Sequence, residues 1–344
     1  MSNTTAKTLT TTLAIDLAKN SFHIHGADHH GHQTISKALT RKRLPTFIAN
    51  LPVCTVVMEA CSGANYFARS FEKMGHQVKL IAPQFVKPFV KSNKNDAADA
   101  EAICEAAQRP NMRFVTAKDL EQQDIQSVHR ARSQCVAHRT AKGNQIRGLL
   151  AEYGIVIPKG LTALRKQIPV ALEDGDNELT PRFRQLLHRL YRALCFADKE
   201  VEFYNQQINE IAKQDQRCQR LQSIPGIGPI VASALVATIG DGSSFASGRE
   251  AAAYLGLVPR QCSTGGKPSL LGISKRGDVY LRSLLIHGGR SVVRHADKHQ
   301  DYRSRWITGV VQRRNVNIAA VAVANKNVRI AWNLLQNQTT YQMS

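Results

Sequence analysis

The sequence has few acidic residues, no long apolar run and no paired cysteines. Its 344 residues include 26 Asp and Glu against 46 Lys and Arg, which gives a formal net charge of +20. The longest clean apolar run, residues 318–324, is far shorter than the ~20 residues that span a bilayer. Residues 1–7 lack the apolar segment of a signal peptide. We therefore expect a cytoplasmic protein whose partner is a polyanion.

The seven cysteines are odd in number and form no C-x-x-C pair, as expected for reduced thiols. Five histidines lie close together in the chain, at His23, His25, His29, His30 and His32. No cysteine lies near them, so we predict that they form the exposed face and the turn of a β-hairpin. Zinc binding is the alternative.

Four carboxylates stand out in the first hundred residues. Asp16 and Glu59 each end a short apolar run, which predicts two buried strands with an acid at the end of each. Asp96 and Asp99 open an Ala-rich stretch that predicts a helix. Their three-residue spacing places both on one helix face, about 5–6 Å apart at Cβ.

Four such acids brought together would repel one another, by about 4 kcal/mol for each close pair at an effective dielectric of 20. A divalent cation removes this penalty, and hard oxygen ligands suit Mg²⁺ or Mn²⁺. Two such ions about 3.5–4 Å apart serve phosphodiester chemistry in many enzymes. The alternative for each acid alone is a helix cap or a solvated loop residue. The combination resembles the ribonuclease-H-like nuclease fold of the resolvase RuvC, in its D-E-D-D form.

The chain is long enough for two or three domains, and we predict three. Residues 1–118 are expected to form the α/β domain, with strands over 21–27, 33–37 and 77–82 and helices over 44–51 and 62–74. Lys87, Lys91 and Lys94 lie just before Asp96, where they could hold phosphates beside the metal. A solvated basic face is the alternative for these lysines.

Residues 119–213 are predicted to form a helical coiled-coil region. A 4-3-4-3 heptad seam runs through Phe183, Leu187, Leu190, Leu194, Ala197, Val201, Tyr204, Ile208 and Ile211. Such a seam needs a partner, either its own hairpin mate or another subunit. A second helix is predicted over 120–153, and residues 158–175 are predicted to be a linker with a basic patch at Arg165 and Lys166.

Residues 214–344 are predicted to form a third, mostly helical domain. It opens with an Ile-Pro-Gly-Ile-Gly run in which Gly226 and Gly228 precede a helix. A tight turn of this kind leaves backbone N–H groups free to hold a phosphate. The run resembles a helix-hairpin-helix motif, and an ordinary helix–helix turn is the alternative.

A Gly-rich turn near residue 265 carries two hydroxyls, Ser263 and Thr264. Pro268 follows the Gly-Gly-Lys sequence, which excludes a P-loop. The cations around the turn are Arg260, Lys267, Lys275 and Arg276. A serine among cations can attack a phosphate when its proton is removed. The alternative, which the chemistry of these residues alone favours, is a loop in which Ser263 donates one hydrogen bond to a phosphate.

These motifs, in this order, resemble one family over nearly the whole chain. They are Asp16, Glu59, the Asp96–Asp99 pair, the Ile-Pro-Gly-Ile-Gly run, the Ser263 turn and the tail Ala-Asn-Lys-Asn-Val-Arg-Ile-Ala-Trp at residues 324–332. The family is the D-E-D-D transposases of insertion-sequence family one-ten, subgroup eleven-eleven.

The resemblance implies a bacterial, nucleoid-associated DNA recombinase with a RuvC-like domain, a coiled coil and a C-terminal transposase domain. It implies that Asp16, Glu59, Asp96 and Asp99 hold Mg²⁺ and that Ser263 links covalently to DNA. Thr264 stands where many relatives carry serine, so it is the alternative nucleophile. The implied partners are donor and target double-stranded DNA, a structured guide RNA and further copies of the chain, as a dimer or tetramer. The candidate nucleic-acid-binding residues are Lys94, Gly226, Gly228, Arg260, Thr264, Lys267, Lys275 and Arg276.

Two other functions remain open at this point. A RuvC-like junction or repair endonuclease would cut DNA by hydrolysis and would not need the Ser263 turn. A catalytically dead scaffold would bind nucleic acid alone, and the presence of all four acids argues against it.

Overall fold

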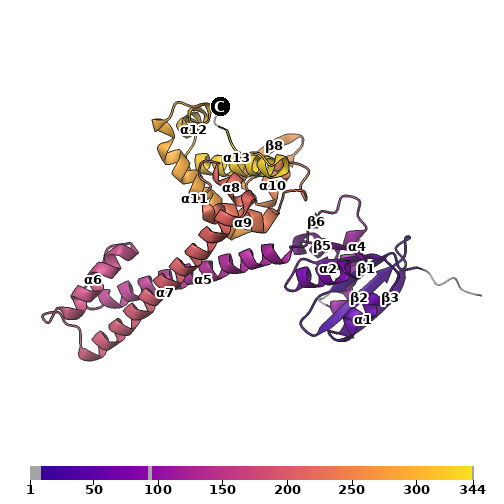
Figure 1. Ribbon diagram of the computed structural model, residues 1–344, viewed down its shortest axis with the longest axis horizontal. Coiled ribbons are helices and arrows are strands. Elements are labelled where there is room, and N and C mark those ends of the chain that lie inside the picture. The colour runs from indigo at the N-terminus through magenta and orange to yellow at the C-terminus, as the bar shows by residue number, and fades with distance from the viewer. Residues whose placement is uncertain (1–8, 92–94, 343–344) are drawn as a thin grey trace, which may run out of the picture. The chain divides into compact units, whose positions relative to one another are not determined.

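The computed structural model describes residues 9–91 and 95–342 (Figure 1). The chain divides into two compact units, one up to Leu120 and the other from Glu121. The first is α/β and the second is mainly helical. Division into three domains at 118 and 213 stays a prediction. Among the described helices, none combines the length and the apolar character needed to cross a bilayer.

The N-terminal unit is built on one six-stranded sheet with the order β3-β2-β1-β4-β5-β6. The strands are β1 (Thr12–Asp16), β2 (Ser21–Ala27), β3 (Gln33–Thr40), β4 (Thr55–Glu59), β5 (Gln77–Ile81) and β6 (Phe114–Val115). The first three form an antiparallel meander, whereas β1, β4 and β5 run parallel. The predicted strands and the polar turn at residues 28–32 are confirmed. The short β6 was not predicted.

Helices cover both faces of this sheet. On one face, α1 (Arg43–Ala49) and α2 (Ala64–Glu72) pack against Leu13 and Ile15. On the other, α4 (Asp96–Ala107) packs against Ala14 and Val57. A short helix, α3 (Pro83–Val86), and a 3₁₀ turn, η1 (Lys87–Phe89), connect β5 to the segment before α4. Because side chains alternate along a strand, residues 14 and 16 of β1 and residues 57 and 59 of β4 all belong to the α4 face.

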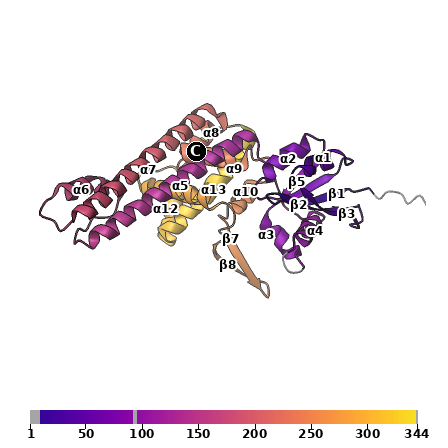
Figure 2. The same ribbon diagram turned by 90° about the horizontal axis from the view of Figure 1, so that it is seen from below.

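The C-terminal unit begins with two long helices, α5 (Leu120–Ala151) and α7 (Pro181–Gln214), which lie side by side in both views (Figures 1 and 2). Residues 183–194 of the heptad seam are buried against Ile146 and Leu150 of α5 and against Leu164 and Ile168. This half of the seam is therefore filled by its own chain. Arg139 of α5 and Arg165 both pair with Asp198 of α7, at 3.2 and 2.7 Å, and they hold the pKa of that carboxyl below its usual value.

The predicted linker at 158–175 is wrong for most of its length. Residues Leu161–Glu173 form a helix, α6, which tolerates Pro169 in its interior. Leu164 and Ile168 are fully buried against the α5–α7 pair. Their four-residue spacing on one helix face was the missed signal, and packing of that face outweighs the proline and the polar flanks.

The rest of the unit is a helical core that carries one β-hairpin. Its helices are α8 (Gln216–Gln222), α9 (Pro229–Ile239), α10 (Gly248–Tyr254), α11 (Val279–His295), η2 (Ala296–Lys298), α12 (Tyr302–Arg313) and α13 (Val316–Asn337). The apolar helix α9 is buried on nearly every side, and α13 shares its core. The hairpin consists of β7 (Pro259–Thr264) and β8 (Lys267–Ile273). The mostly helical character is confirmed, but the strands flanking the Gly-rich turn were not predicted.

A buried polar group ties α5 to this core. His129 of α5 bonds Ser233 of α9 at 2.9 Å through Nε2 and Tyr280 of α11 at 3.0 Å through Nδ1. Ser233 donates its own proton to the carbonyl of Pro229, so His129 Nε2 is the donor to Ser233 and the tyrosine hydroxyl donates to Nδ1. The imidazole is thus neutral. Burial, reinforced by Arg132, lowers its pKa to about 4.

Candidate active site

Three of the four predicted acids converge at one end of the sheet. Asp16, Asp96 and Asp99 can each offer a carboxylate oxygen such that all three atoms lie within 4.8 Å of one another. Asp16 arrives from the end of β1 on the α4 face. Asp96 and Asp99 occupy the first turn of α4, whose start is fixed by Asn95, which accepts a bond from the Ala97 N–H at 3.0 Å.

Glu59, the fourth acid, lies close enough to feel the others. Its pKa is raised, first by burial and then by the charges of Asp16 and Asp99. It comes from the end of β4, which pairs with β1 in parallel, so the two acids leave adjacent strands at the same edge. Its carboxylate is not within the 4.8 Å group. The site is therefore a cluster of three acids with a fourth beside it.

The prediction that His23 and His25 lie on an exposed face is wrong. Both are half-buried on the α4 side of β2, because β2 pairs antiparallel with β1 and places His23 opposite Asp16. His23 Nδ1 lies 3.6 Å from Asp96 Oδ2. Burial lowers the pKa of His25. Phe22 and Ile24 alternate with the histidines and face α1 and α2, so the local pattern gave no sign that α4 covers the other face of β2.

The exposed turn predicted for the remaining histidines is confirmed, since His29, His30 and His32 are all exposed. Asp28 organises that turn by accepting bonds from the backbone N–H groups of His30 and His32, both at 2.9 Å.

Sequence reasoning also missed Cys61, which follows β4 by two residues. Its pKa is raised by partial burial and then by the charges of Glu59 and Asp16, although Cys61 is among the exposed cysteines. A thiol held protonated in this way is a poor metal ligand. The cluster therefore offers oxygen ligands first, with His23 beside Asp96.

The lysines predicted to flank the acids have different positions. Lys87 is exposed in η1. Lys91 pairs with Glu105 and Glu101 of α4, at 2.8 and 3.7 Å, so part of its charge is neutralised within the unit. Lys94 lies outside the described residues.

The second candidate site is the tip of the β7–β8 hairpin. Ser263 and Thr264 end β7, directly before Gly265 and Gly266. Both glycines have positive φ, +58° and +76°, as a tight two-residue hairpin turn requires. All six residues of β7 are exposed. Ser263 Oγ accepts a bond from Gln261 Nε2 at 2.8 Å.

The four predicted cations surround this hairpin and are all exposed. Arg260 and Lys267 lie on the strands, while Lys275 and Arg276 follow β8 directly. The backbone of Lys275 takes a positive φ of 55°, and its N–H donates to the carbonyl of Gly256. No acid lies between Pro259 and Gly277 in the sequence. The hairpin is thus a basic arm that carries two hydroxyls.

The two glycines of the Ile-Pro-Gly-Ile-Gly run differ. Gly226 has φ +88°, and a Cβ there would meet the carbonyl oxygen of Gly288 at 2.8 Å, so glycine is needed for packing between this turn and α11. Gly228 is exposed at the start of α9, with open space around a Cβ. Phosphate contacts by both stay predictions, and helix packing alone accounts for Gly226.

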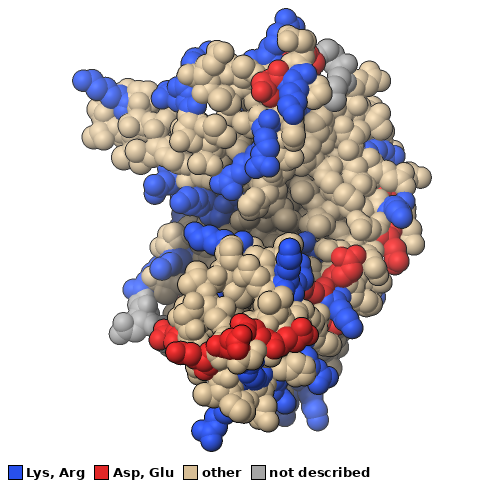
Figure 3. Space-filling view, turned by 90° about the vertical axis from the view of Figure 1, so that its left-hand side faces the viewer, with Lys and Arg blue, Asp and Glu red and all other residues tan. Residues whose placement is uncertain are grey.

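An acid cluster at strand ends, in a strongly basic chain, is typical of enzymes that act on nucleic acid. Figure 3 shows Lys and Arg side chains scattered over the visible face, while the Asp and Glu side chains lie in fewer places. Residues 13–155 match a family of DEDD sequences described as "Transposase". Residues 218–304 match the "Transposase IS116/IS110/IS902 family".

Individual relatives agree over almost the whole chain. A probable family 20 transposase of Pseudomonas aeruginosa is 49% identical over 331 residues, covering 96% of this chain and 98% of that protein. The transposase for insertion sequence element IS1111A of Coxiella burnetii is 46% identical, with 96% and 91% covered. The transposase for IS1328 of Yersinia enterocolitica is 44% identical, with 96% and 98% covered. The chain belongs to the IS110 family of insertion-sequence transposases and is a DNA transposase.

Proposed function

We propose that this transposase cuts and rejoins DNA with a divalent cation held by its four carboxylates and with Ser263 as the nucleophile. The observation that carries the proposal is the convergence of Asp16, Asp96 and Asp99 within 4.8 Å. The N-terminal unit is proposed to be RuvC-like. An antiparallel β1–β2–β3 meander followed by parallel β4 and β5, with acids at the ends of β1 and β4, supports this assignment.

The donor set fits Mg²⁺ or Mn²⁺. Carboxylates as close as Asp16, Asp96 and Asp99 repel one another. The pKa of Glu59 beside them is raised by burial and then by the charges of Asp16 and Asp99. Oxygen ligands of this kind are those that hard divalent cations prefer. A bound cation would polarise a phosphate and lower the pKa of an attacking hydroxyl. Asp16, Glu59, Asp96 and Asp99 would hold it.

The serine step balances as an exchange of phosphate esters. Ser263 Oγ forms a bond to the scissile phosphorus and loses its proton, while the bond from phosphorus to one DNA oxygen breaks and that oxygen gains a proton. The product is a phosphoserine ester, so the strand can be rejoined without an external energy source. Arg260 and Lys267, exposed on the same hairpin, would stabilise negative charge on the phosphate.

The proposed partners are donor and target duplex DNA, a structured guide RNA and further copies of the chain, with the bacterial nucleoid as the place of action. The net charge of +20 supports polyanionic partners. In the assembly proposed from the family resemblance, the acids of one subunit and the serine of another form one composite site.

The test is to trap the covalent product on DNA that carries the ends of the element. We expect Mg²⁺-dependent protein–DNA adducts, located on Ser263 by mass spectrometry of the cross-linked peptide. Ser263→Ala should abolish both cleavage and adduct, whereas Thr264→Ala should keep both. Adducts on Thr264 would move the nucleophile by one residue. Cleaved DNA without any adduct would overturn the proposal in favour of a hydrolysing RuvC-like endonuclease, and intact DNA in favour of a binding scaffold.

A further inference from the structure

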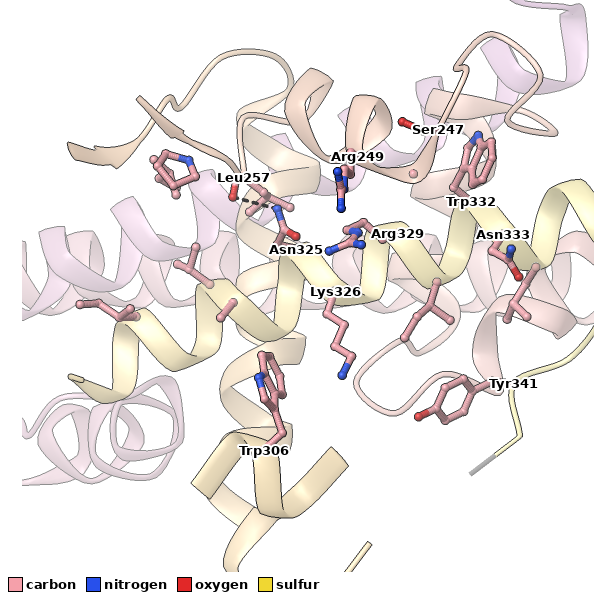
Figure 4. Close-up of a pocket in the computed structure, with 18 of the residues that line it drawn as sticks. Ser247, Arg249, Leu257, Trp306, Asn325, Lys326, Arg329, Trp332, Asn333 and Tyr341 are labelled. Atoms are coloured by element: carbon pink, nitrogen blue, oxygen red, sulfur yellow. Dashed lines mark hydrogen bonds between the residues drawn. The ribbon is translucent and has the colours of Figure 1, made fainter. Parts of the chain in front are cut away.

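The C-terminal unit contains a large pocket that the proposed reaction does not use. Its volume is about 1820 Å³, and α10, α12, α13, the two hairpin strands and residues 339–342 line it. We call it the α13 pocket, because the tail motif at residues 324–332 of that helix provides much of its wall. Arg249, Trp306, Lys326, Arg329, Trp332 and Tyr341 are its principal polar and aromatic residues (Figure 4).

The pocket carries four cations in a largely apolar lining. Arg249, Arg314, Lys326 and Arg329 line it, and no Asp or Glu does so among the residues that the structure describes. Figure 4 shows the side chains of Arg249 and Arg329 pointing toward one another, a geometry that like charges take at a cost unless an anion lies between them. The pKa of Lys326 is lowered by burial and by the charges of Arg303 and Arg329. Among the residues that the structure describes, no carboxylate offsets these charges in the lining.

Arg303 adds a buried charge beside this wall. It is only 6% exposed, and its guanidinium lies 5.6 Å from the centre of the Tyr341 ring. Nη2 donates to Asn327 and to the carbonyl of Pro225, but Nε and Nη1 have no hydrogen-bond partner. A buried guanidinium that no carboxylate of the described residues pairs with raises the positive potential of the pocket that it adjoins.

Aromatic rings complete the lining. Trp306 of α12 is half-buried, with Lys326 Nζ 4.5 Å from its ring centroid. Trp332 of α13 is held in place by a 3.0 Å bond from Nε1 to the carbonyl of Gly242. Asn317, Asn325 and Asn333 provide amides. Cations beside aromatic rings, without acids, are the recognition elements for unpaired nucleic acid, whose backbone follows the charges and whose bases stack.

The pocket also adjoins the base of the serine hairpin. Pro259 of β7 and Leu270 and Leu271 of β8 are among its lining residues. The bond from Asn325 Nδ2 to the carbonyl of Leu257 fixes α13 to the segment just before β7 (Figure 4). Ser263 lies near the turn at the other end of the same hairpin.

We propose that the α13 pocket binds a single strand of DNA, with phosphates at Arg249, Lys326 and Arg329 and a base stacked on Trp306. Charge complementarity selects a polyanion, and the half-buried rings in the lining select unpaired bases. DNA is the occupant because DNA is the substrate of a transposase. The direction toward Ser263 rests on the proposed function, whereas the binding itself does not.

Binding is measured by fluorescence anisotropy with a labelled unpaired oligodeoxynucleotide, on the full chain carrying Ser263→Ala and in EDTA. No DNA cleavage is expected under these conditions, so the binding measurement does not depend on whether Ser263 is the nucleophile. We expect the double variant Lys326→Ala/Arg329→Ala to bind about tenfold or more weakly. Each phosphate contact on a single strand contributes about 0.7 to the slope of log affinity against log salt. Loss of two contacts should therefore reduce the magnitude of that slope by about 1.4.

Trp306→Leu tests the stacking. It should weaken binding by about tenfold while leaving the salt slope unchanged, because it removes a base contact and no charge. Arg305→Ala is the matched control, since Arg305 is exposed on the same helix but does not line the pocket. It should lower affinity less than twofold. Thermal unfolding of each variant shows whether a loss of binding is caused by a loss of folding. In the Arg305→Ala control, a DNA strand that contains 5-iodouracil should cross-link to Trp306.

Three results would overturn the proposal. If both pocket variants bound DNA with wild-type affinity, the pocket would not be a DNA-binding site. An RNA strand of the same sequence that binds more than tenfold tighter, with the same loss in the variants, would assign the pocket to RNA. A change of oligomeric state in the variants by light scattering, without a change in DNA affinity, would assign it to a second copy of the chain.

Discussion

The two units of this transposase concentrate charges of opposite sign. The N-terminal unit brings acids together at the edge of a sheet, where Asp16, Asp96 and Asp99 repel one another. The C-terminal unit collects cations around the α13 pocket and the serine hairpin, with no acid in the described lining of the pocket. Like charges at this spacing repel one another, and a ligand of opposite charge relieves the repulsion. A cation suits the first and a phosphate backbone suits the second.

The difference also lies in how the residues are held. The acids sit at the ends of buried strands and at a capped helix start, so their positions follow from the core. The serine and its neighbouring cations sit on an exposed hairpin. A metal site needs ligands fixed to within a few tenths of an ångström, whereas a phosphate-binding arm can adjust to its substrate.

Removal of one acid should have the largest effect. Asp96→Asn deletes a charge from the predicted metal site, so we expect cleavage in Mg²⁺ to fall by more than about 100-fold, with DNA binding in EDTA within twofold of wild type. Glu101→Gln is the control, since Glu101 lies on the same helix and pairs with Lys91 instead. If both variants lost the same amount of cleavage activity, the effect would come from the total negative charge of α4 and not from the position of Asp96 in the acid cluster.

A core substitution should separate the two units by stability. Leu187 is fully buried in the α5–α6–α7 cluster, so Leu187→Ala should destabilise the C-terminal unit by about 2–5 kcal/mol. The unfolding transition of the N-terminal unit should not move in calorimetry.

Leu186→Ala is the neighbouring control, because Leu186 is 44% exposed. It should cost less than about 1 kcal/mol. Because the chain itself fills the seam at 183–194, Leu187→Ala should lower the stability of the α5–α6–α7 helices. If the variant instead lost its oligomers while the unfolding transition stayed unchanged, a partner subunit would lie on that seam.

Acid should destabilise the C-terminal unit through His129. Its pKa is about 4 when folded, against 6.5 for an ordinary histidine, so the unfolded chain binds the proton first as the pH falls. Stability is full above pH 6.5 and is lost on acidification, by about 3 kcal/mol at pH 4. The nearby Arg132 opposes protonation, and Asp278 favours it.

The measurement is urea unfolding of wild type and His129→Gln between pH 7.5 and 4. Glutamine keeps a donor and an acceptor but does not titrate, so the stability difference between the two proteins should shrink by that amount. A constant difference across this range would show that His129 accepts its proton without unfolding.

The smallest predicted effect is a gain. Burial and two neighbouring acids raise the pKa of Glu59, so its negative charge opposes folding at neutral pH and that cost disappears as the pH falls. Glu59→Gln should therefore raise the midpoint of N-terminal unfolding slightly in EDTA. The same variant should reduce the further rise that Mg²⁺ gives to wild type. A lower midpoint in EDTA would mean that the Glu59 carboxylate stabilises the metal-free fold.

The acid cluster could be predicted because each acid directly follows an apolar run or opens a helix, signals that are local in sequence. The half-buried histidines could not be assigned without knowing that α4 covers their side of β2. Helix α6 was not predicted, because Pro169 and the polar flanking residues are typical of a linker. The strands β7 and β8 are exposed on both faces, so they lack the alternation that identifies a strand. The α13 pocket combines segments up to 95 residues apart, from Ser247 to Gln342, and no local pattern identifies it.

The exposure of the β7–β8 hairpin has a consequence for the accuracy of transposition. A lone two-stranded hairpin is marginally stable in water, and no residue of β7 is buried. If Ser263 is the nucleophile, as proposed above, we expect contacts with bound DNA to set the position of its hydroxyl, so that binding energy appears in the rate of strand cleavage. Shortened or mismatched DNA should lose turnover rate more than affinity. The enzyme would then reject a wrong sequence by leaving it uncut, even when it stays bound.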